Sequence, residues 1–341
     1  MQYRSSHLQG LQRNLKVRKQ TMVVYFYEAF QEEADALRSL LGSDITFELT
    51  SKTIQETGHS EAPARLISIR TQSKIPPEWV ENLDGILSRS TGYDHLIAYR
   101  KQIDKPLPLG YLEEYSTRAV AEHAVLLTMA LLRKLPQQMR QFPAFNRDGL
   151  TGFECAGKNL LVVGVGRIGG EIVKIARGLG FHVKGVDIVP DKPDVTYVSK
   201  HDGNSWADVI ICAMNLTDEN KGYFSYDLLR GSKRGCIFVN IARGEHSPLN
   251  GLSRLLRESH LAGLGLDVFE DEGSFATALR SGRAGESPAV QIVNDLLSHP
   301  NVLLTPHNAF NSGEALQRKA AMSVEQIRYF LKHRDFIWKV E

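Results

Sequence analysis

Residues 160–187 read LLVVGVGRIGGEIVKIARGLGFHVKGVD. An apolar run of strand character leads into three glycines spaced G-x-G-x-x-G, at Gly164, Gly166 and Gly169. Apolar residues with helical spacing follow, and a second strand-like run then ends at Asp187. The order of strand, glycine turn, helix, strand and acid is typical of a βαβ unit that binds a dinucleotide.

Each glycine of this turn has a physical role. Gly164 permits the tight turn, Gly166 lets the backbone approach a pyrophosphate, and Gly169 lets the helix pack close to the strand. The start of the helix offers free N–H groups and a positive dipole end to the phosphates. The carboxylate of Asp187 is placed to accept hydrogen bonds from the adenosine ribose and would repel a 2′-phosphate, so NAD is favoured over NADP. The alternative for Asp187 is a cap or turn residue.

The whole chain has 341 residues, more than one ordinary core needs, which indicates two domains. Hydrophobic residues make up 42% and charged residues 23%, as in soluble globular proteins. The net charge of +2 gives no basis for binding nucleic acid or a membrane, and no apolar run reaches the ~18 residues of a transmembrane helix. Three cysteines without a C-x-x-C pair indicate neither disulfides nor a metal site, and favour the cytoplasm.

The first hundred residues show a small α/β pattern without a glycine fingerprint. Strand-like runs occupy residues 22–27, 46–49, 65–69 and 86–90, and residues 32–41 have helical spacing. The segment before them, residues 1–21, carries five Lys or Arg and no acid. We interpret it as a disordered basic extension, with a transit-like segment and an upstream start codon as alternatives.

The rest of the chain predicts a connector and a second α/β unit. Residues 115–135 predict a long apolar helix that Ser116 or Thr117 caps and Pro136 stops. Further apolar runs lie at residues 209–214, 236–241, 263–268 and 302–304, before a final helix at residues 312–333. Runs without alternation predict parallel strands covered on both faces. We expect a doubly wound domain at residues 125–311, and a first domain at residues 22–124 that residues 312–341 rejoin.

Three polar residues follow predicted strands of the second unit. Arg243 comes after CIFVNIA, Glu272 lies five residues after Asp267, and His307 comes after NVLLTP. Singly, each has an ordinary explanation as a solvated or structural residue. Together they supply what the reduction of a ketoacid requires: an Arg that pairs with the carboxylate, a His that donates the proton, and a Glu that favours the imidazolium.

At this point the sequence resembles a known family. The segments VVGVGRIGGEI, VNIARGE, LGLDVFEDE and NVLLTPHNAF are similar, in order and spacing, to those of D-isomer-specific 2-hydroxyacid dehydrogenases, and within them to the D-lactate dehydrogenase branch. The resemblance implies an α/β fold of two Rossmann-like domains: a doubly wound NAD-binding domain and a smaller, flavodoxin-like substrate domain. It also implies an NAD-dependent oxidoreductase acting on a small 2-ketoacid, such as pyruvate, and a homodimer formed through the NAD-binding domain.

The resemblance also implies roles for individual residues. Arg243, Glu272 and His307 would be catalytic. The cofactor contacts would be Arg167 and Ile168 at the pyrophosphate, Asp187 at the ribose, Met214, Asn215 and Asn220 in the AMNLTDEN loop, Ile241 and Ala242 through their backbone, and Asp267 at the carboxamide. For Asp267, a strand-end turn residue is the alternative.

Besides Arg243, four residues would contact the substrate. The backbone N–H groups of Thr91 and Gly92, in RSTGYD, would hold the substrate carboxylate, although this segment alone also fits a plain turn. Tyr115 would face the substrate, and Phe310 would line its pocket, with a simple core position as the alternative for both aromatics.

The chain departs from the family pattern at two places, and other functions stay open. Asn215 stands where the family often has Pro, and the segment YFYEAFQEE has no Arg near Phe30, where some lactate enzymes carry one. Glu272 disfavours a formate dehydrogenase, which has Gln there, and we identify too few basic residues near the pocket for a phosphate-bearing substrate. The alternatives are an NADH-sensing, corepressor-like binding protein and a dehydrogenase for glyoxylate, hydroxypyruvate or a branched-chain 2-ketoacid.

Overall fold

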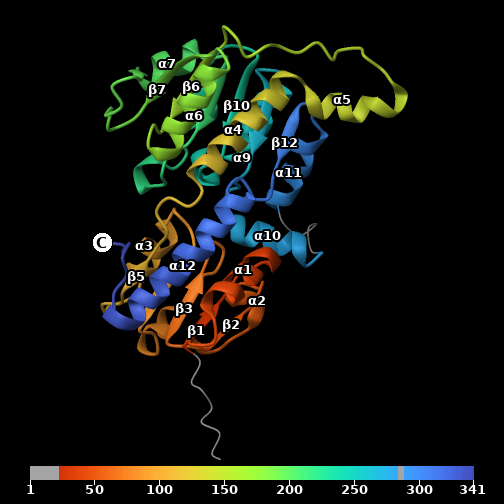
Figure 1. The fold of residues 1–341 in the computed structure, drawn as a ribbon. Helices are drawn as coiled ribbons and strands as arrows, with labels where there is room; N and C mark the ends of the chain where they lie inside the picture. The colour runs from red at the N-terminus through yellow and green to blue at the C-terminus, as the bar shows by residue number, and fades with distance from the viewer. Residues whose placement is uncertain (1–22, 283–287) are drawn as a thin grey trace, which may run out of the picture.

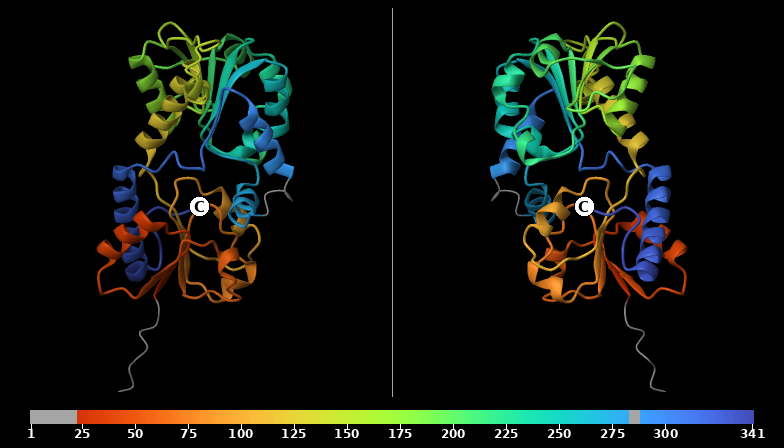
Figure 2. Two further views of the ribbon diagram at one scale, coloured as in Figure 1. Left: turned by 90° about the vertical axis from the view of Figure 1, so that its right-hand side faces the viewer. Right: turned by 90° about the vertical axis from the view of Figure 1, so that its left-hand side faces the viewer.

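The protein is described by a computed structural model that covers residues 23–282 and 288–341. The interpretation of residues 1–21 therefore lies outside the described residues. The chain forms two lobes, one above the other, each built around a parallel sheet with helices on both faces (Figures 1 and 2). This confirms the predicted fold class.

The smaller lobe contains a five-stranded sheet in the order β2-β1-β3-β4-β5. Its strands are β1 (Val24–Phe26), β2 (Phe47–Leu49), β3 (Leu66–Ile69), β4 (Gly85–Ser88) and β5 (Leu109–Gly110). Helices α1 (Gln31–Leu41) and α12 (Gly313–His333) pack on one face, and α2 (Ile54–Thr57), the 3₁₀ helix η1 (Pro77–Glu81) and α3 (Asp94–Arg100) lie on the other. This strand order is the flavodoxin-like one.

The larger lobe contains a seven-stranded sheet in the order β12-β11-β10-β9-β6-β7-β8. Its strands are β6 (Asn159–Val163), β7 (His182–Val186), β8 (Thr196–Tyr197), β9 (Val209–Cys212), β10 (Cys236–Asn240), β11 (Leu261–Leu266) and β12 (Val302–Leu304). β6 lies between β7 and β9. From β6 the chain continues to β7 and β8 on one side of it, and then crosses to β9 on the other side. The crevice at such a reversal is where open α/β sheets bind ligands.

Helices cover both faces of the larger sheet. On one face lie α4 (Thr117–Leu132) and α6 (Arg167–Gly178); on the other lie α7 (Lys200–Trp206), α8 (Tyr226–Arg230), α9 (Leu249–Arg257) and α11 (Pro288–Ser298). The helix α10 (Glu272–Arg280) begins after β11 and reaches toward the smaller lobe (Figure 1). Because the sheet is covered on both faces, β9 and β10 are buried along their whole length, as their apolar runs predict.

The predicted helix at residues 115–135 is wrong at its end and in its cap. α4 ends at Leu132, and Lys134 has a left-handed backbone, with φ of 52°. Pro136 does not stop a helix but lies in the first turn of the next one, α5 (Leu135–Gln141), where its missing N–H costs nothing. Ser116 is the residue before the helix, but its side chain makes no capping hydrogen bond. The strands β5 and β8 were not predicted, because two residues are too few to show a pattern.

Both sheets direct the carboxyl ends of their strands toward the boundary between the lobes (Figures 1 and 2). The C-terminal helix α12 packs against α1, and the residues after it reach β5, where Val340 N–H donates to the Leu109 carbonyl. Over the described residues, no helix is long and apolar enough to cross a membrane.

Candidate active site

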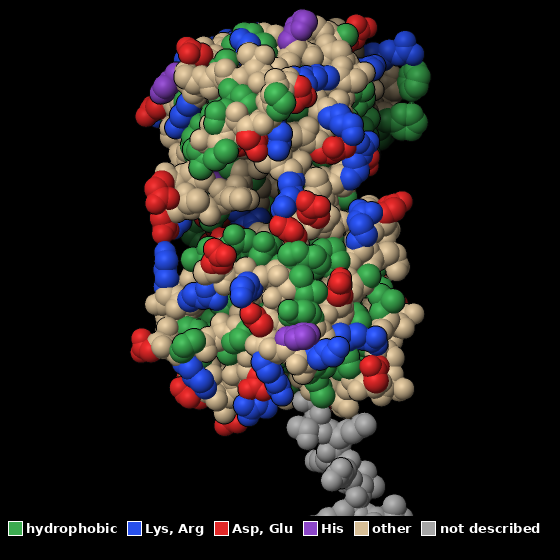
Figure 3. Space-filling model, turned by 60° about the vertical axis from the view of Figure 1, so that its left-hand side comes forward, with side chains coloured by type: hydrophobic (Ala, Val, Ile, Leu, Met, Phe, Trp, Pro, Cys, Tyr) green, Lys and Arg blue, Asp and Glu red, His purple; other side chains and the backbone are tan. Residues whose placement is uncertain are grey.

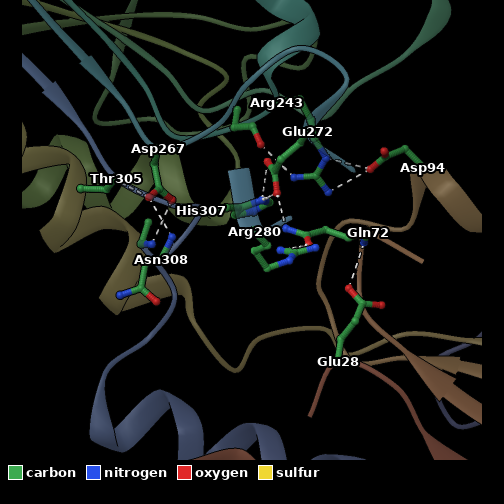
Figure 4. A network of polar contacts seen from close by, with 12 residues as sticks. Glu28, Gln72, Asp94, Arg243, Asp267, Glu272, Arg280, Thr305, His307 and Asn308 are labelled. Carbon is green, nitrogen blue, oxygen red and sulfur yellow. Dashed lines mark hydrogen bonds and ion pairs between the residues drawn. The ribbon is translucent and has the colours of Figure 1, made fainter. Parts of the chain in front are cut away.

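A cavity of about 400 Å³ lies between the lobes, and the surface is hollowed there (Figure 3). The three residues expected to be catalytic, Arg243, Glu272 and His307, all line it. Asp94 and Gln72 of the smaller lobe line it as well (Figure 4). The structure thus brings together groups that lie up to 235 residues apart in the sequence, as the difference between 307 and 72 shows.

His307 and Glu272 form a close pair. The His307 Nδ1 lies 2.7 Å from Oε1 and 2.8 Å from Oε2 of Glu272. Both side chains are mostly buried, with 19% and 18% of their surface exposed. Burial favours the protonated form of Glu272, but the hydrogen bond and charge of His307, with Gln72 and Arg243, hold the pKa of this carboxyl below its usual value. An ionised carboxylate beside Nδ1 orients the ring so that Nε2 is left for a substrate.

Asp267 stabilises the loop that carries His307. Its side chain is fully buried, and its carboxylate accepts hydrogen bonds from Thr305 Oγ1 and from the backbone N–H groups of Asn308 and Ala309. The His307 backbone is left-handed, with φ of 50°, a conformation that a non-glycine residue keeps only when its surroundings fix it. Asp267 therefore serves as the turn residue that was the alternative at this position, and its contact with a carboxamide stays a prediction.

Arg243 is held between the lobes. Its Nε and Nη2 donate to Oδ1 of Asp94 at 3.0 and 2.9 Å, and its Nη1 donates to the Ala242 carbonyl at 2.8 Å. A guanidinium has five N–H groups, so two remain for a ligand. A Cβ on Gly92 would lie 1.8 Å from Nη2, so only glycine allows Arg243 to occupy this position.

The segment RSTGYD presents free donors beside Arg243. In the described parts of the chain, no group accepts a hydrogen bond from the backbone N–H of Thr91 or Gly92. The loop is fixed from behind, because Ser90 Oγ donates to the Gly92 carbonyl and also lies 2.6 Å from Ser88 Oγ, which in turn contacts His95 Nε2 at 2.8 Å. This arrangement agrees with the expected carboxylate site.

Gln72 is a site residue that the sequence did not reveal. Its Nε2 donates to Glu272 Oε1 at 3.2 Å from the opposite lobe, and its Oε1 accepts from Arg280 Nη1 at 3.2 Å. Glu28 fixes the loop that carries it, because the Glu28 carboxylate accepts from the backbone N–H groups of Arg70, Gln72 and Ser73 (Figure 4). The position of Gln72 three residues after the end of β3 was the available signal, but an amide there carries no distinctive chemistry.

A second cavity of about 480 Å³ adjoins the first, since His307 and Glu272 line both. Phe310 lines it, as expected for a pocket aromatic. Tyr115 is 4% exposed in the core of the smaller lobe and lines neither cavity, although its ring lies 6.4 Å from that of Phe310. Its contact with substrate remains a prediction, and its observed position is the alternative core position.

Basic residues that sequence inspection missed also line the second cavity. Arg70 and Arg280 lie on its wall, and Lys319 reaches it from α12. Arg280 lies eight residues after LGLDVFEDE and Lys319 nine residues after NVLLTPHNAF, but only the packing of the lobes brings them and Arg70 to one cavity. The expectation of too few basic residues near the pocket is therefore wrong.

The glycine turn has the geometry that a dinucleotide needs. Gly164 has φ of 91°, and a Cβ there would lie 2.7 Å from the backbone of Ala213 and Met214 after β9. A Cβ on Gly169 would lie 1.9 Å from the Gly164 carbonyl oxygen, so helix and turn are in close contact. A Cβ on Gly166 would meet nothing within 4 Å, so the backbone there faces open space, as a pyrophosphate requires.

Asp187, Arg167 and Ile168 flank the glycine turn. Asp187 accepts hydrogen bonds from the backbone N–H groups of Val165 and Val189 at 2.5 and 2.9 Å, so it fixes the turn. Arg167 opens α6 and pairs with Glu113 and Glu114 at 2.8 and 2.5 Å. Ile168 follows it at the start of α6 and packs against the core below. Their contacts with a cofactor stay predictions.

The loop after β9 is fixed by a buried histidine. His246 is fully buried, and its ring nitrogens lie 3.3 Å from the Met214 carbonyl and 3.2 Å from the Asn220 carbonyl. The Asn220 side chain donates to the Asn215 carbonyl at 2.7 Å, which closes the loop on itself. Ile241 and Ala242 follow β10, with side chains in the core, which agrees with contacts through their backbone.

No metal centre accompanies this site. Among the residues that the structure describes, no group of three or more His, Cys, Asp or Glu could hold a metal ion. Cys155, Cys212 and Cys236 are all free.

Comparison with known proteins agrees with this geometry. The family profile described as D-isomer specific 2-hydroxyacid dehydrogenase, NAD binding domain, matches residues 125–309. The chain is 28% identical over 295 residues to 2-hydroxyacid dehydrogenase A of Aspergillus oryzae, which covers 85% of this chain and 84% of that protein. It is 28% identical over 281 residues to D-lactate dehydrogenase of Escherichia coli, covering 79% and 83%. A solved structure of D-lactate dehydrogenase from Aquifex aeolicus with NAD and lactic acid matches with a TM-score of 0.81 and 25% identity, over 92% of this chain and 98% of that one.

Proposed function

Because the chain belongs to the D-isomer specific 2-hydroxyacid dehydrogenase family, an NAD-dependent oxidoreductase family, we propose that it reduces a small 2-ketoacid, with pyruvate as the simplest candidate, to the D-2-hydroxyacid. His307 would act as the acid–base group, Glu272 as its partner, and Arg243 as the group that binds the substrate carboxylate. The observation that carries this proposal is the His307–Glu272 pair, at 2.7 Å, in the same cavity as Arg243.

The residues of the cavity would have different roles in the reaction. The two free N–H groups of Arg243 and the backbone N–H groups of Thr91 and Gly92 bind the carboxylate and orient the carbonyl carbon. When bound, NADH supplies the hydride for this carbon. His307 donates the proton from Nε2 to the carbonyl oxygen, and Glu272 stabilises the charged imidazolium until then. In the reverse direction His307 accepts the same proton.

Steady-state assays with NADH or NADPH and a panel of 2-ketoacids test the proposal. We expect turnover with NADH of at least one 2-ketoacid, and a loss of ~10²- to 10⁴-fold in kcat in His307→Gln, which removes the proton donor and keeps a polar side chain. His201→Gln, on the exposed surface at α7, is the matched control and should behave as the unmodified protein. NADH binding without reduction of any ketoacid would instead favour an NADH-sensing protein.

We also propose that the protein forms a homodimer in the cytoplasm. A cluster of exposed apolar residues supports the dimer, since Met139, Phe142, Phe145 and Phe153 are 55–72% exposed on or near α5, which projects from the larger lobe (Figure 1). A second copy of this lobe would cover them. Light scattering after gel filtration should give twice the chain mass, and the double substitution Phe142→Ser with Phe145→Ser should reduce it to one. The three free cysteines agree with a reducing compartment.

A further inference from the structure

Arg70 contacts two aromatic rings but has no hydrogen-bond or ion-pair partner among the described residues. It follows β3 and lines the 480 Å³ cavity, where its guanidinium carbon lies 4.3 Å from the centre of the Phe310 ring and 5.7 Å from that of Phe30. Its Nε is shielded from solvent, and within the described ranges none of its side-chain N–H groups donates a hydrogen bond. Leaving such donors unsatisfied is unfavourable, so the geometry calls for an acceptor from outside the chain.

Behind Arg70 lies a buried ion cluster with an excess of positive charge. The Glu33 carboxylate lies 2.8 Å from Arg89 Nε and 2.7 Å from Lys319 Nζ, and all three side chains are less than 5% exposed. One carboxylate therefore pairs with two cations, and the positive charge of Arg70 also stabilises the ionised form of Glu33. Burial lowers the pKa of Lys319 to about 7; Glu33 opposes this shift, whereas Arg70 and Arg89 add to it.

Within the described residues, none of the carboxylates on the cavity wall forms an ion pair with Arg70. Glu28 is occupied by three backbone N–H groups, and Glu272 is occupied by His307 and Gln72. Glu32 is exposed to solvent. Arg280, in contrast, is paired, because its Nε donates to Glu56 at 2.9 Å. Arg70 is thus the cation of this wall that is free to bind an anion.

We infer that the side chain of the 2-ketoacid ends in a second acidic group, a carboxylate or a phosphate, and that Arg70 binds it. This inference rests on the proposed function, because it places the reacting carbonyl at His307 and the far end of the substrate in the adjoining cavity. The terminal nitrogens of Arg70 match two oxygens of such a group. Phe30 and Phe310 would pack on the methylenes between the two acidic ends.

Pairs of substrates that match in shape and differ in charge test this inference in the unmodified enzyme. 2-Oxoglutarate pairs with 5-methyl-2-oxohexanoate, and oxaloacetate pairs with 4-methyl-2-oxopentanoate. In each pair we expect kcat/KM to favour the acidic member by ~10- to 100-fold, as charge-assisted hydrogen bonds do. 3-Phosphohydroxypyruvate forms a separate arm, and its preference over both dicarboxylates would identify the acidic group as a phosphate.

The substitution Arg70→Met assigns the preference to this side chain. It should remove most of the preference within each pair, while the conservative Arg70→Lys should restore part of it. Arg65→Met is the matched control, because Arg65 precedes the same strand but pairs with Asp84 on the surface, and the preference should persist there. Thermal unfolding of each variant confirms that it is folded.

The possible outcomes distinguish a failure of this inference from a failure of the proposed function. If no 2-ketoacid is reduced, the proposed function fails. If 2-ketoacids are reduced but the neutral member of each pair serves as well as the acidic one, or Arg70→Met lowers kcat/KM for both members equally, the function stands and the role of Arg70 is overturned.

Discussion

Both sheets present the carboxyl ends of their strands to the same cavity, but they contribute different kinds of group. The larger sheet provides the groups proposed for catalysis: Arg243 after β10, Glu272 after β11 and His307 after β12. The smaller sheet provides groups that hold them: Asp94 binds Arg243, and Gln72 binds Glu272. Arg243 and Glu272 are thus each held by a residue of the other lobe, so the placement of one lobe on the other is itself part of the chemistry.

Among the contacts between the lobes, Asp94 should have the largest effect on activity when it is removed. Asp94→Ala leaves Arg243 without its bidentate partner in a largely buried position, so the guanidinium loses its orientation toward the substrate carboxylate. We expect kcat/KM to fall by ~100-fold and Asp94→Asn, which keeps an acceptor oxygen, to lose less. Steady-state kinetics with the best 2-ketoacid measures both variants.

An exposed ion pair across the same boundary provides the control. Asp218 of the larger lobe pairs with Lys101 of the smaller lobe at 3.2 Å, with both side chains 66% exposed. Because solvent screens such a pair, Asp218→Ala should change kcat/KM by less than ~3-fold. A rise in kcat/KM in Asp94→Ala would mean that Asp94 competes with the substrate for Arg243, which would reverse the division between the lobes.

A smaller effect, with a distinctive pH dependence, should follow from removing Gln72. The hydrogen bond from Gln72 is one of the contacts that lower the pKa of Glu272, so in Gln72→Leu this pKa should rise toward its usual value. Glu272 would then take up its proton at a higher pH, and the acidic limb of the profile of kcat/KM against pH should move upward. At neutral pH we expect a loss of ~10-fold.

Gln102→Leu is the matched control, since the Gln102 side chain donates to the carbonyl of Ala98 in the preceding helix α3 and has no contact with Glu272 in the described structure. Its pH profile should coincide with that of the unmodified protein. An unshifted acidic limb in Gln72→Leu would show that the contact between the lobes does not act on the acid–base pair.

The same comparison explains what could be predicted from the sequence. The site residues of the larger lobe can be recognised in the sequence. The glycine turn has a strict spacing, and Arg243 and His307 each follow an apolar run that predicts a buried strand. In the smaller lobe, Arg70 and Gln72 also follow a strand, but nothing in the sequence shows that this strand end faces His307. That information exists only in the packing of the two lobes.

Asp94 shows this limit within a motif that was recognised. The segment RSTGYD was interpreted as the loop that binds the substrate carboxylate, and the free N–H groups of Thr91 and Gly92 agree with this. The same segment also carries the partner of Arg243, which lies 149 residues further along the chain. Spacing predicts backbone shape over a few residues, whereas an ion pair over this distance depends on the tertiary structure.

The smallest effect on activity, but a measurable effect on stability, should come from His95 behind the same loop. Burial lowers the pKa of His95 to about 4, although the charge of Asp94 opposes the shift. Between pH ~6.5 and ~4 the unfolded chain binds a proton that the folded chain does not, so the free energy of unfolding falls as the pH falls. From pH ~7.5 to ~5 this contribution amounts to about 2 kcal/mol, and it is absent in His95→Gln.

Urea unfolding at both pH values should therefore show a smaller loss of stability in His95→Gln than in the unmodified protein. The control is His182→Gln, at an exposed position on β7, which should lose as much stability as the unmodified protein. An equal loss in His95→Gln would mean that His95 is not held neutral behind the substrate loop, and the supporting role of the smaller lobe would then be limited to its contacts with Arg243 and Glu272.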